Sequence, residues 1–229
     1  MQPEPGRCVW VIIAAYNEAA VIARVIADVS RHNYQVVVVD DGSHDETANA
    51  AAITGAIVVQ HPVNLGQGAA LQTGIEFALQ QGADYVVTFD ADGQHRAMDI
   101  AALLDALTAN EADFALGSRF LGASIELPPA RRMLLKVATW FTRATTGLRL
   151  TDTHNGLRAM TRRGASRIGL RQNRMAHASE LLDQIARSGL KYVEVPVTVE
   201  YSAYSLAKGQ RLADSLTIIV DLSAQKLHR

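Results

Sequence analysis

Residues 85–95 read YVVTFDADGQH, a short β-forming run that passes directly into two aspartates, Asp90 and Asp92. A mostly apolar run of this length, followed by a turn signal, is typical of a strand that is buried on both faces. Ala91 and Gly93 are small, so the chain can turn sharply and direct both carboxylates to one point. The stretch therefore predicts a buried strand with paired carboxylates at its carboxyl end.

Similar runs stand on both sides of this stretch and alternate with helical patterns. The predicted strands are VWVIIAA (9–15), VVVV (36–39), AIVVQ (56–60) and DFALGSR (113–119). Helical spacing of apolar residues follows each of the first four strands, and Ser43 with Glu46 fits a capping box for the second helix. The alternation predicts an α/β fold, with a mostly parallel twisted sheet, helices on both faces and ligands beyond the carboxyl ends of the strands.

The 229 residues suffice for one domain. The single cysteine, Cys8, excludes an internal disulfide framework, and the apolar run near the start lacks the length and flanks of a secretory signal. No segment approaches the ~20 apolar residues that are needed to cross a bilayer. We expect a cytoplasmic chain that does not span a membrane, although it can still lie on one.

Charge is unevenly distributed along the chain, although the net charge is only −1. Residues 1–118 hold 4 basic and 15 acidic residues, a net charge of −11. Residues 119–174 hold 12 basic and 2 acidic residues, a net charge of +10. The middle segment therefore predicts an anionic partner, with a solvated arginine-rich face as the alternative.

The acidic strand ends suggest a metal and a nucleotide. Asp90 and Asp92 match the preference of Mg²⁺ and Mn²⁺ for carboxylate oxygens, with substrate phosphates completing the coordination shell; the alternative is a polar turn. Asp40 and Asp41 either hold a nucleotide or cap the next helix. The loop NLGQG (64–68) could bring backbone N–H groups to a phosphate, although its spacing is not that of a P-loop.

Seven segments, in their order and spacing, resemble the inverting family-2 glycosyltransferases with the A-type fold. They are AAYNE (14–18), VVVVDDGSHDET (36–47), NLGQGAALQTGI (64–75), FDADGQH (89–95), LGSR (116–119), DTHNGLRAM (152–160) and VEVPVTVEYSAYSLAKGQ (193–210). The closest branch is the dolichol-phosphate mannosyltransferase or polyprenyl-phosphate sugar transferase group. The resemblance implies transfer of a hexose from a nucleotide-diphosphate sugar, a GDP- or UDP-hexose, to a lipid-phosphate acceptor, with Mg²⁺ or Mn²⁺ as cofactor. It implies a membrane surface as a partner and no nucleic acid.

The resemblance also implies roles for individual residues. The nucleotide-binding positions are Ala14, Tyr16, Asn17, Glu18, Asp40, Asp41, Gly68, Asp90 and Ala91. The metal ligands are Asp90, Asp92 and Gln94, the phosphate or acceptor ligands are Arg119, Arg131, Arg132 and Lys208, and the catalytic group is Asp92, Arg119 and Arg132. Two departures remove no ligand: Ala14 and Arg96 stand where the family usually has proline, which bears on the shape of the base pocket and the rigidity of the metal loop.

We expect one glycosyltransferase domain over residues 1–229, with a nucleotide-sugar half (1–118), an acceptor half (119–211) and a C-terminal amphipathic helix (212–229). Three alternatives stay open: a saccharide acceptor in cell-surface polysaccharide synthesis, a sugar nucleotidyltransferase and a non-catalytic nucleotide-sugar sensor. A nucleotidyltransferase usually has a glycine-rich, basic loop after its first strand, and AAYNEAA is neither.

The nature of the acceptor decides whether a general base is needed. An alcohol needs one, with Asp152 and Glu180 as candidates, whereas a phosphate is already an anion. We expect His95 and His154 to be exposed loop residues. A catalytic role is the second interpretation for both.

Residues 131–149, RRMLLKVATWFTRATTGLR, predict a helix in which apolar residues alternate with arginine and lysine. This pattern is typical of a helix that lies on an anionic membrane surface, and the alternative is an apolar face that packs on the sheet. With this helix we expect the chain to be peripheral at the inner face of the cytoplasmic membrane.

Overall fold

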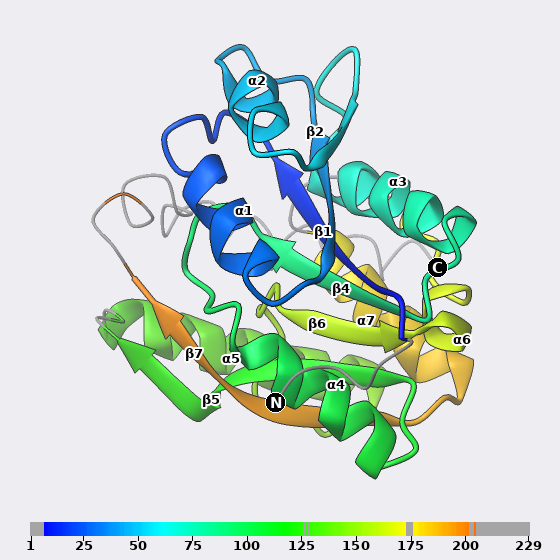
Figure 1. The fold of residues 1–229 in the computed structure, drawn as a ribbon. Helices are drawn as coiled ribbons and strands as arrows, with labels where there is room; N and C mark the ends of the chain where they lie inside the picture. Colours follow the sequence, from blue (N-terminus) through cyan, green and yellow to red (C-terminus); the bar gives the residue numbers. More distant parts are fainter. Residues whose placement is uncertain (1–6, 126, 128, 173–175, 202–203, 205–229) are drawn as a thin grey trace.

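The computed structural model describes residues 7–125, 127, 129–172, 176–201 and 204, whose strands form one seven-stranded sheet in the order β3-β2-β1-β4-β6-β5-β7 (Figure 1). The strands are β1 (Val9–Ala15), β2 (Gln35–Asp40), β3 (Ile57–Gln60), β4 (Tyr85–Asp90), β5 (Phe114–Ile125), β6 (Arg158–Thr161) and β7 (Tyr192–Glu200). Only β6 runs antiparallel to its neighbours among these strands. The predicted mostly parallel sheet is confirmed.

Helices cover both faces of this sheet. They are α1 (Ile22–Ser30), α2 (Thr47–Ala52), α3 (Gln67–Gln80), α4 (Asp99–Ala109), α5 (Pro129–Thr146), α6 (Arg162–Ala165) and α7 (Ala176–Ser188). In β1, Val11 and Ile13 pack with α1 and α4, whereas Trp10 and Ile12 pack with α3 and α7. Because side chains alternate along a strand, the uninterrupted apolar sequence of β1 serves two cores at once.

Parallel pairing brings the polar strand ends together. Ala14 of β1 pairs with Asp90 of β4, and Ala15 pairs with Asp40 of β2. The segments that follow these three strands therefore leave the sheet at one edge, as the sequence predicted.

The start of α2 differs from the prediction. The helix begins at Thr47, and no side chain caps it. The hydroxyl of Ser43 instead accepts a hydrogen bond from the backbone N–H of Asn17 at 2.9 Å, and Glu46 accepts one from Asn49. The predicted capping box is wrong because Ser43 has a partner on the neighbouring loop, 26 residues earlier in the chain.

The second half of the sheet also differs in detail. β5 continues beyond the predicted Arg119 to Ile125, because β7 pairs with it on both sides of an irregularity between Ser118 and Ala123. β6 was not predicted, since a strand of four residues carries little periodicity. The predicted helix at 212–229 lies outside the described residues. No described helix is long and apolar enough to cross a membrane.

The orientation of α5 reverses the usual pattern of an amphipathic helix. Thr139 and Thr142 are buried, whereas Met133, Val137 and Trp140 are 68%, 48% and 69% exposed. The three exposed residues recur at helical spacing and form a single stripe. The alternative that the apolar face of this helix packs on the sheet is wrong for these three residues.

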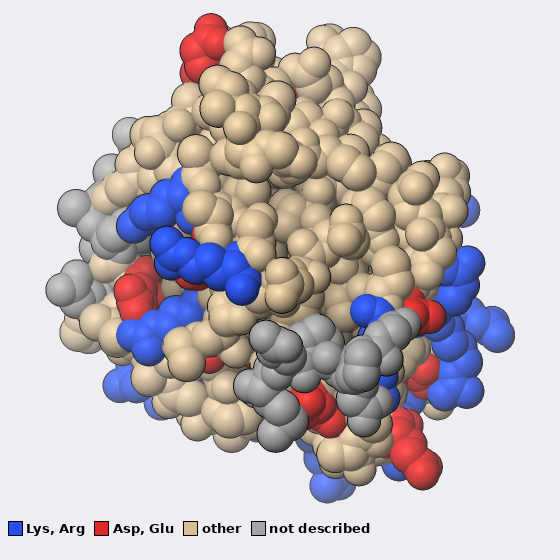
Figure 2. All heavy atoms as spheres, in the orientation of Figure 1, with Lys and Arg blue, Asp and Glu red and all other residues tan. Residues whose placement is uncertain are grey.

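The basic residues of segment 119–174 do not form one surface. Lys and Arg lie in separate groups on the left and on the right of Figure 2, and the group on the right is at the end of the molecule where Figure 1 places α6. Arg162, Arg163 and Arg167 are exposed in and after α6, and Arg163 pairs with Asp113 at 2.6 Å. This part of the predicted basic segment therefore belongs to a solvated face.

Candidate active site

The strand ends enclose a cavity of about 430 Å³. Of the predicted site residues, it is lined by Ala14, Tyr16, Glu18, Asp41, Asp90, Ala91, Asp92, Gln94, Arg119 and Arg131. Asn17, Asp40, Gly68 and Arg132 do not line it, and Lys208 lies outside the described residues. The structure thus brings most of the predicted site residues to one place.

Asp90 is held by two side chains. His95 Nε2 lies 3.1 Å from Asp90 Oδ2, and Gln67 Nε2 donates to Oδ1 at 3.3 Å. Burial alone would raise the pKa of Asp90, but the hydrogen bond with His95 and the nearby charge of Arg158 hold this pKa below its usual value. His95 is buried, so the expectation of an exposed loop histidine is wrong: it supports Asp90 from inside the molecule.

Asp92 carries the opposite perturbation. Burial and the charge of Asp90 raise the pKa of Asp92 from 3.8 to about 6. The turn that brings the two carboxylates together uses Gly93 with φ +73°, a conformation that glycine adopts readily. The negative charges of the two carboxylates repel each other, and a cation bound between them would offset this repulsion.

The donor set fits Mg²⁺ or Mn²⁺. Asp90 and Asp92 supply carboxylate oxygens, and the side-chain oxygen of Gln94 is a further candidate ligand. The described residues contain no group of three or more His, Cys, Asp or Glu side chains suited to a metal. An ion held here would therefore rely on one or two carboxylates together with substrate oxygens, which is how Mg²⁺ is usually bound.

Asp41 organises the loop before α3 and does not cap α2. Its carboxylate accepts hydrogen bonds from the backbone N–H groups of Leu65 and Gly66 at 2.9 and 2.7 Å, and His61 binds it at 2.8 Å. These N–H groups are thus committed to Asp41, contrary to the suggestion that the loop offers them to a phosphate. Gly68 packs so closely on the backbone of Gln172 that a Cβ would overlap it, so here glycine permits packing.

Asn17 and Asp40 stabilise the neighbouring loops. The Asn17 side chain accepts a hydrogen bond from the backbone N–H of His44 at 2.9 Å. Asp40 accepts one from the N–H of Ser43 at 3.3 Å and one from the Gln60 amide at 3.5 Å. Both residues therefore shape the rim of the cavity from outside its lining.

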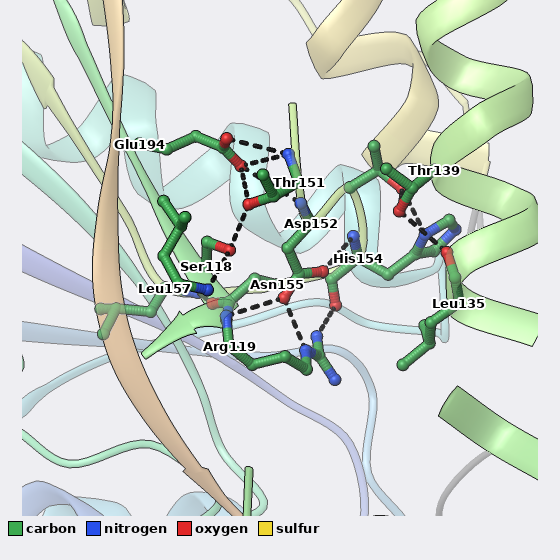
Figure 3. A network of polar contacts seen from close by, with 12 residues as sticks. Ser118, Arg119, Leu135, Thr139, Thr151, Asp152, His154, Asn155, Leu157 and Glu194 are labelled. Carbon is green, nitrogen blue, oxygen red and sulfur yellow. Dashed lines mark hydrogen bonds and ion pairs between the residues drawn. The ribbon is translucent and has the colours of Figure 1, made fainter. Parts of the chain in front are cut away.

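Arg119 stands at the centre of a buried polar network (Figure 3). Its Nε donates to Asp152 Oδ2 at 2.6 Å, a terminal nitrogen donates to the carbonyl oxygen of His154 at 2.6 Å, and the other donates to the Tyr201 hydroxyl. A guanidinium has five N–H donors, so these bonds leave part of the fork for a ligand in the cavity that Arg119 lines. Arg119 is therefore a structural ion-pair partner of Asp152, and it also has N–H groups left for a ligand.

Neither candidate general base is placed for that role. Asp152 is buried in its ion pair with Arg119 and does not line the cavity. Glu180 lies outside the cavity too, where its carboxylate accepts hydrogen bonds from the backbone N–H groups of Arg171 and Gln172 at 2.9 and 2.8 Å. Both candidates are corrected to structural residues.

His154 differs from the exposed histidine that we expected. It lines the cavity, and burial lowers its pKa from 6.5 to about 4, with Arg119 and Arg158 acting in the same direction. The ring is therefore neutral at pH 7, and its Nδ1 lies 2.9 Å from the hydroxyl of Thr153. A neutral ring can orient a ligand by hydrogen bonding without adding charge.

Arg158 and Gly156 are two of the lining residues that were not predicted as site residues. Arg158 of β6 is 4% exposed and borders the cavity. Gly156, two residues earlier, lies so close to Asp90 that a Cβ would overlap the carboxylate. Both belong to the segment DTHNGLRAM, but a glycine and an arginine at a strand end carry no chemical signature of their own.

Comparison with known proteins gives a consistent result. The profile described as "Glycosyl transferase family 2" matches residues 10–169. A UDP-N-acetylglucosamine–dolichyl-phosphate N-acetylglucosaminyltransferase of Methanococcus voltae is 30% identical over 243 residues, covering 96% of this chain and 97% of the relative. A polyprenol monophosphomannose synthase of Mycolicibacterium smegmatis is 33% identical over 207 residues, covering 85% of this chain and 78% of the relative.

A solved structure shares the fold. It is glucosyl-3-phosphoglycerate synthase of Mycobacterium tuberculosis in complex with Mn²⁺ and UDP-glucose, with a TM-score of 0.73 and 22% identity. The match covers 97% of this chain and 79% of that chain.

Proposed function

Because the chain belongs to glycosyl transferase family 2, we propose that it transfers a hexose from a GDP- or UDP-hexose to the phosphate of a polyprenyl phosphate. It is a glycosyltransferase. One relative, at 30% identity, is named for the transfer of N-acetylglucosamine to dolichyl phosphate, and another, at 33% identity, is named for the synthesis of polyprenol monophosphomannose. Their names support a lipid phosphate here.

The observation that carries the acceptor proposal is the stripe of Met133, Val137 and Trp140 on α5. On the same helix, Arg131 lines the cavity and lies over the ring of Tyr201, 5.2 Å from its centroid. One helix therefore joins an exposed apolar surface to the site where phosphates would bind. A polyprenyl phosphate has the matching chemistry, with an apolar chain and an anionic head.

A basic row accompanies the apolar stripe. Arg132, Lys136 and Arg143 are exposed and recur along α5 at the same helical spacing. Exposed basic residues beside apolar ones favour an anionic membrane surface, by about 1 kcal/mol per residue near the surface. We place the protein peripherally at the inner face of the cytoplasmic membrane, with Arg132 acting in docking and not in the cavity.

The proposed reaction is a single displacement. A phosphate oxygen of the acceptor attacks the anomeric carbon of the sugar from the side opposite the nucleoside diphosphate. The new C–O bond forms as the bond to the diphosphate breaks, so the configuration inverts and the nucleoside diphosphate leaves. Because a phosphate acceptor is already an anion, the structural roles of Asp152 and Glu180 do not obstruct this step.

The residues around the cavity divide this work between them. Tyr16, Glu18 and Asp41 border the nucleotide end, whereas Arg119 and Arg131 supply fixed positive charge suited to phosphate oxygens. Asp90, Asp92 and Gln94 would hold the Mg²⁺ or Mn²⁺ ion. When it is bound, such an ion stabilises the negative charge that develops on a departing diphosphate.

The experiment that tests this function measures the released product with different acceptors. We expect UDP or GDP to form from one nucleotide sugar when Mn²⁺ and undecaprenyl phosphate in vesicles are both present. Release that requires a saccharide in place of the lipid would support the polysaccharide alternative. Pyrophosphate released in a parallel reaction from UTP or GTP and a hexose 1-phosphate would indicate a nucleotidyltransferase. Binding of nucleotide sugar without any product would indicate a sensor.

A further inference from the structure

Arg158 is a buried cation that the described residues leave without a direct partner. It is 4% exposed, and its side chain makes no hydrogen bond or close ion pair with any described residue. Its nitrogen atoms are not among the fully enclosed unpartnered atoms, and the residue lines the cavity. A guanidinium has five N–H donors, so those of Arg158 are available only to something inside the cavity.

The carboxylates near Arg158 do not account for it. Asp90 and Asp152 both act on its charge through space. Asp152, however, already binds Arg119 at 2.6 Å, and Asp90 is held by His95 at 3.1 Å and by Gln67 at 3.3 Å. Each carboxylate therefore has closer partners, and a buried charge without a direct partner is unfavourable unless a ligand completes it.

The backbone places Arg158 firmly. It begins β6 and pairs with Thr88 of β4, whose hydroxyl donates to the carbonyl oxygen of Gly156 at 2.7 Å. A side chain on a strand inside a sheet is held more precisely than one on a loop. Because the same strand β4 ends in Asp90, Arg158 keeps a fixed position relative to the proposed metal-binding carboxylates.

We propose that Arg158 is a phosphate-binding residue of this cavity and that it donates hydrogen bonds to an anionic oxygen of a substrate. The inference rests on the proposed function only for the identity of the two phosphate sources, the donor diphosphate and the acceptor phosphate. Arg158 complements Arg119, whose guanidinium is largely committed to Asp152, Tyr201 and His154. His154, which lines the same cavity, is neutral and adds no positive charge. Arg158 is therefore a principal source of positive charge in this part of the cavity lining.

Binding measurements on Arg158→Lys and Arg158→Gln test this inference without turnover. The donor arm uses UDP and GDP with Mn²⁺, and the acceptor arm uses inorganic phosphate and farnesyl phosphate in EDTA. Arg163→Lys is the matched control, because Arg163 pairs with Asp113 on the exposed face away from the cavity. Isothermal titration and ligand-induced thermal shifts are recorded for each protein.

We expect Arg158→Gln to weaken one class of probe by about 10- to 100-fold, the loss of a hydrogen bond to a charged group. Arg158→Lys should lose less, since it keeps the charge but not the planar fork. Weaker UDP or GDP binding assigns Arg158 to the donor, and weaker phosphate and farnesyl phosphate binding assigns it to the acceptor. Both results support the inference, and the control should bind as the wild type does.

The opposing result is a change in folding alone. If both variants unfold more easily but bind every probe as the wild type does, Arg158 is a counter-charge for Asp90 and Asp152 and the inference is overturned. If neither variant folds, phenylglyoxal modification of wild-type Arg158, mapped by mass spectrometry, should be slowed by a bound probe, and no protection overturns the inference. A protein that transfers no sugar to lipid but binds UDP through Arg158 would contradict only the proposed function.

Discussion

Replacing Asp92 with asparagine should stabilise the metal-free protein at pH 8. In the folded protein the pKa of Asp92 is raised from 3.8 to about 6, by burial and by the charge of Asp90. The folded state therefore holds this proton more tightly than the unfolded state. The resulting penalty on folding is absent below about pH 4, grows as the pH rises and is complete above the folded pKa of about 6.

The size of the effect follows from the same values. The displacement from 3.8 to about 6 corresponds to at most about 3 kcal/mol, at about 1.4 kcal/mol per pH unit. Partial contact with solvent makes about 2 kcal/mol the working expectation. For a domain of this size that is a rise in Tm of about 4–8 °C.

The assay is urea unfolding in EDTA at pH 4.5 and pH 8, followed by tryptophan fluorescence. Trp10 is 5% exposed and reports on the core, whereas Trp140 is already 69% exposed. Asp92→Asn should exceed the wild type in free energy of unfolding at pH 8 and by much less at pH 4.5. The comparison of the two proteins removes the opposite contribution of Asp113, whose pKa is lowered by its hydrogen bond with Arg163.

Mn²⁺ with UDP or GDP should reverse the order at pH 8. A ligand that binds only the folded state raises its stability, and the wild type keeps both carboxylates for the ion. Equal stability of the two proteins in EDTA at pH 8 would refute the argument that these carboxylates disfavour each other. A variant that gains as much stability from Mn²⁺ as the wild type would refute Asp92 as a ligand.

Three further changes test other parts of the structure. Arg119→Ala should cost about 3–5 kcal/mol in urea unfolding, because it leaves Asp152 buried without its partner; a loss under 1 kcal/mol would contradict the ion pair. Gly156→Ala should cost about 1–3 kcal/mol and reduce stabilisation by Mn²⁺, because its Cβ would displace Asp90; unchanged Mn²⁺ stabilisation speaks against that contact. Trp140→Ser should change the free energy of unfolding by less than about 0.5 kcal/mol, yet weaken sedimentation with anionic vesicles at low salt; undiminished sedimentation would show that α5 does not dock.

The sequence predicted the first half of the fold well because its strands are continuous apolar runs. Val38 and Ile12 are fully buried on opposite faces of one sheet, and this burial is what the runs indicate. β6 escaped prediction because its four residues include a buried arginine, Arg158, which no hydrophobic pattern indicates. Short strands that pair with distant segments are decided by tertiary contacts and not by local pattern.

The site was predictable where residues follow strands and less so where side chains compete for partners. Asp90 and Asp92 lie at the cavity because β4 ends there. The structural role of Asp152 depends on Arg119, 33 residues away in the chain, and that pairing leaves no trace in the local sequence. The exposed stripe of α5 was visible as a pattern, but only packing could show that threonines face inward and Trp140 faces out.

Following the sugar itself shows whether a lipid phosphate is the acceptor. Purified protein is incubated with radiolabelled GDP- or UDP-hexoses, Mn²⁺ and vesicles containing undecaprenyl phosphate, and the organic extract is counted, with Asp92→Ala as the inactive control. We expect label from at least one donor to enter the organic phase only when the lipid phosphate and Mn²⁺ are present, and we expect mild acid to release this label as free hexose. Label that stays in the aqueous phase with every donor, while a saccharide acceptor becomes labelled, would contradict this expectation.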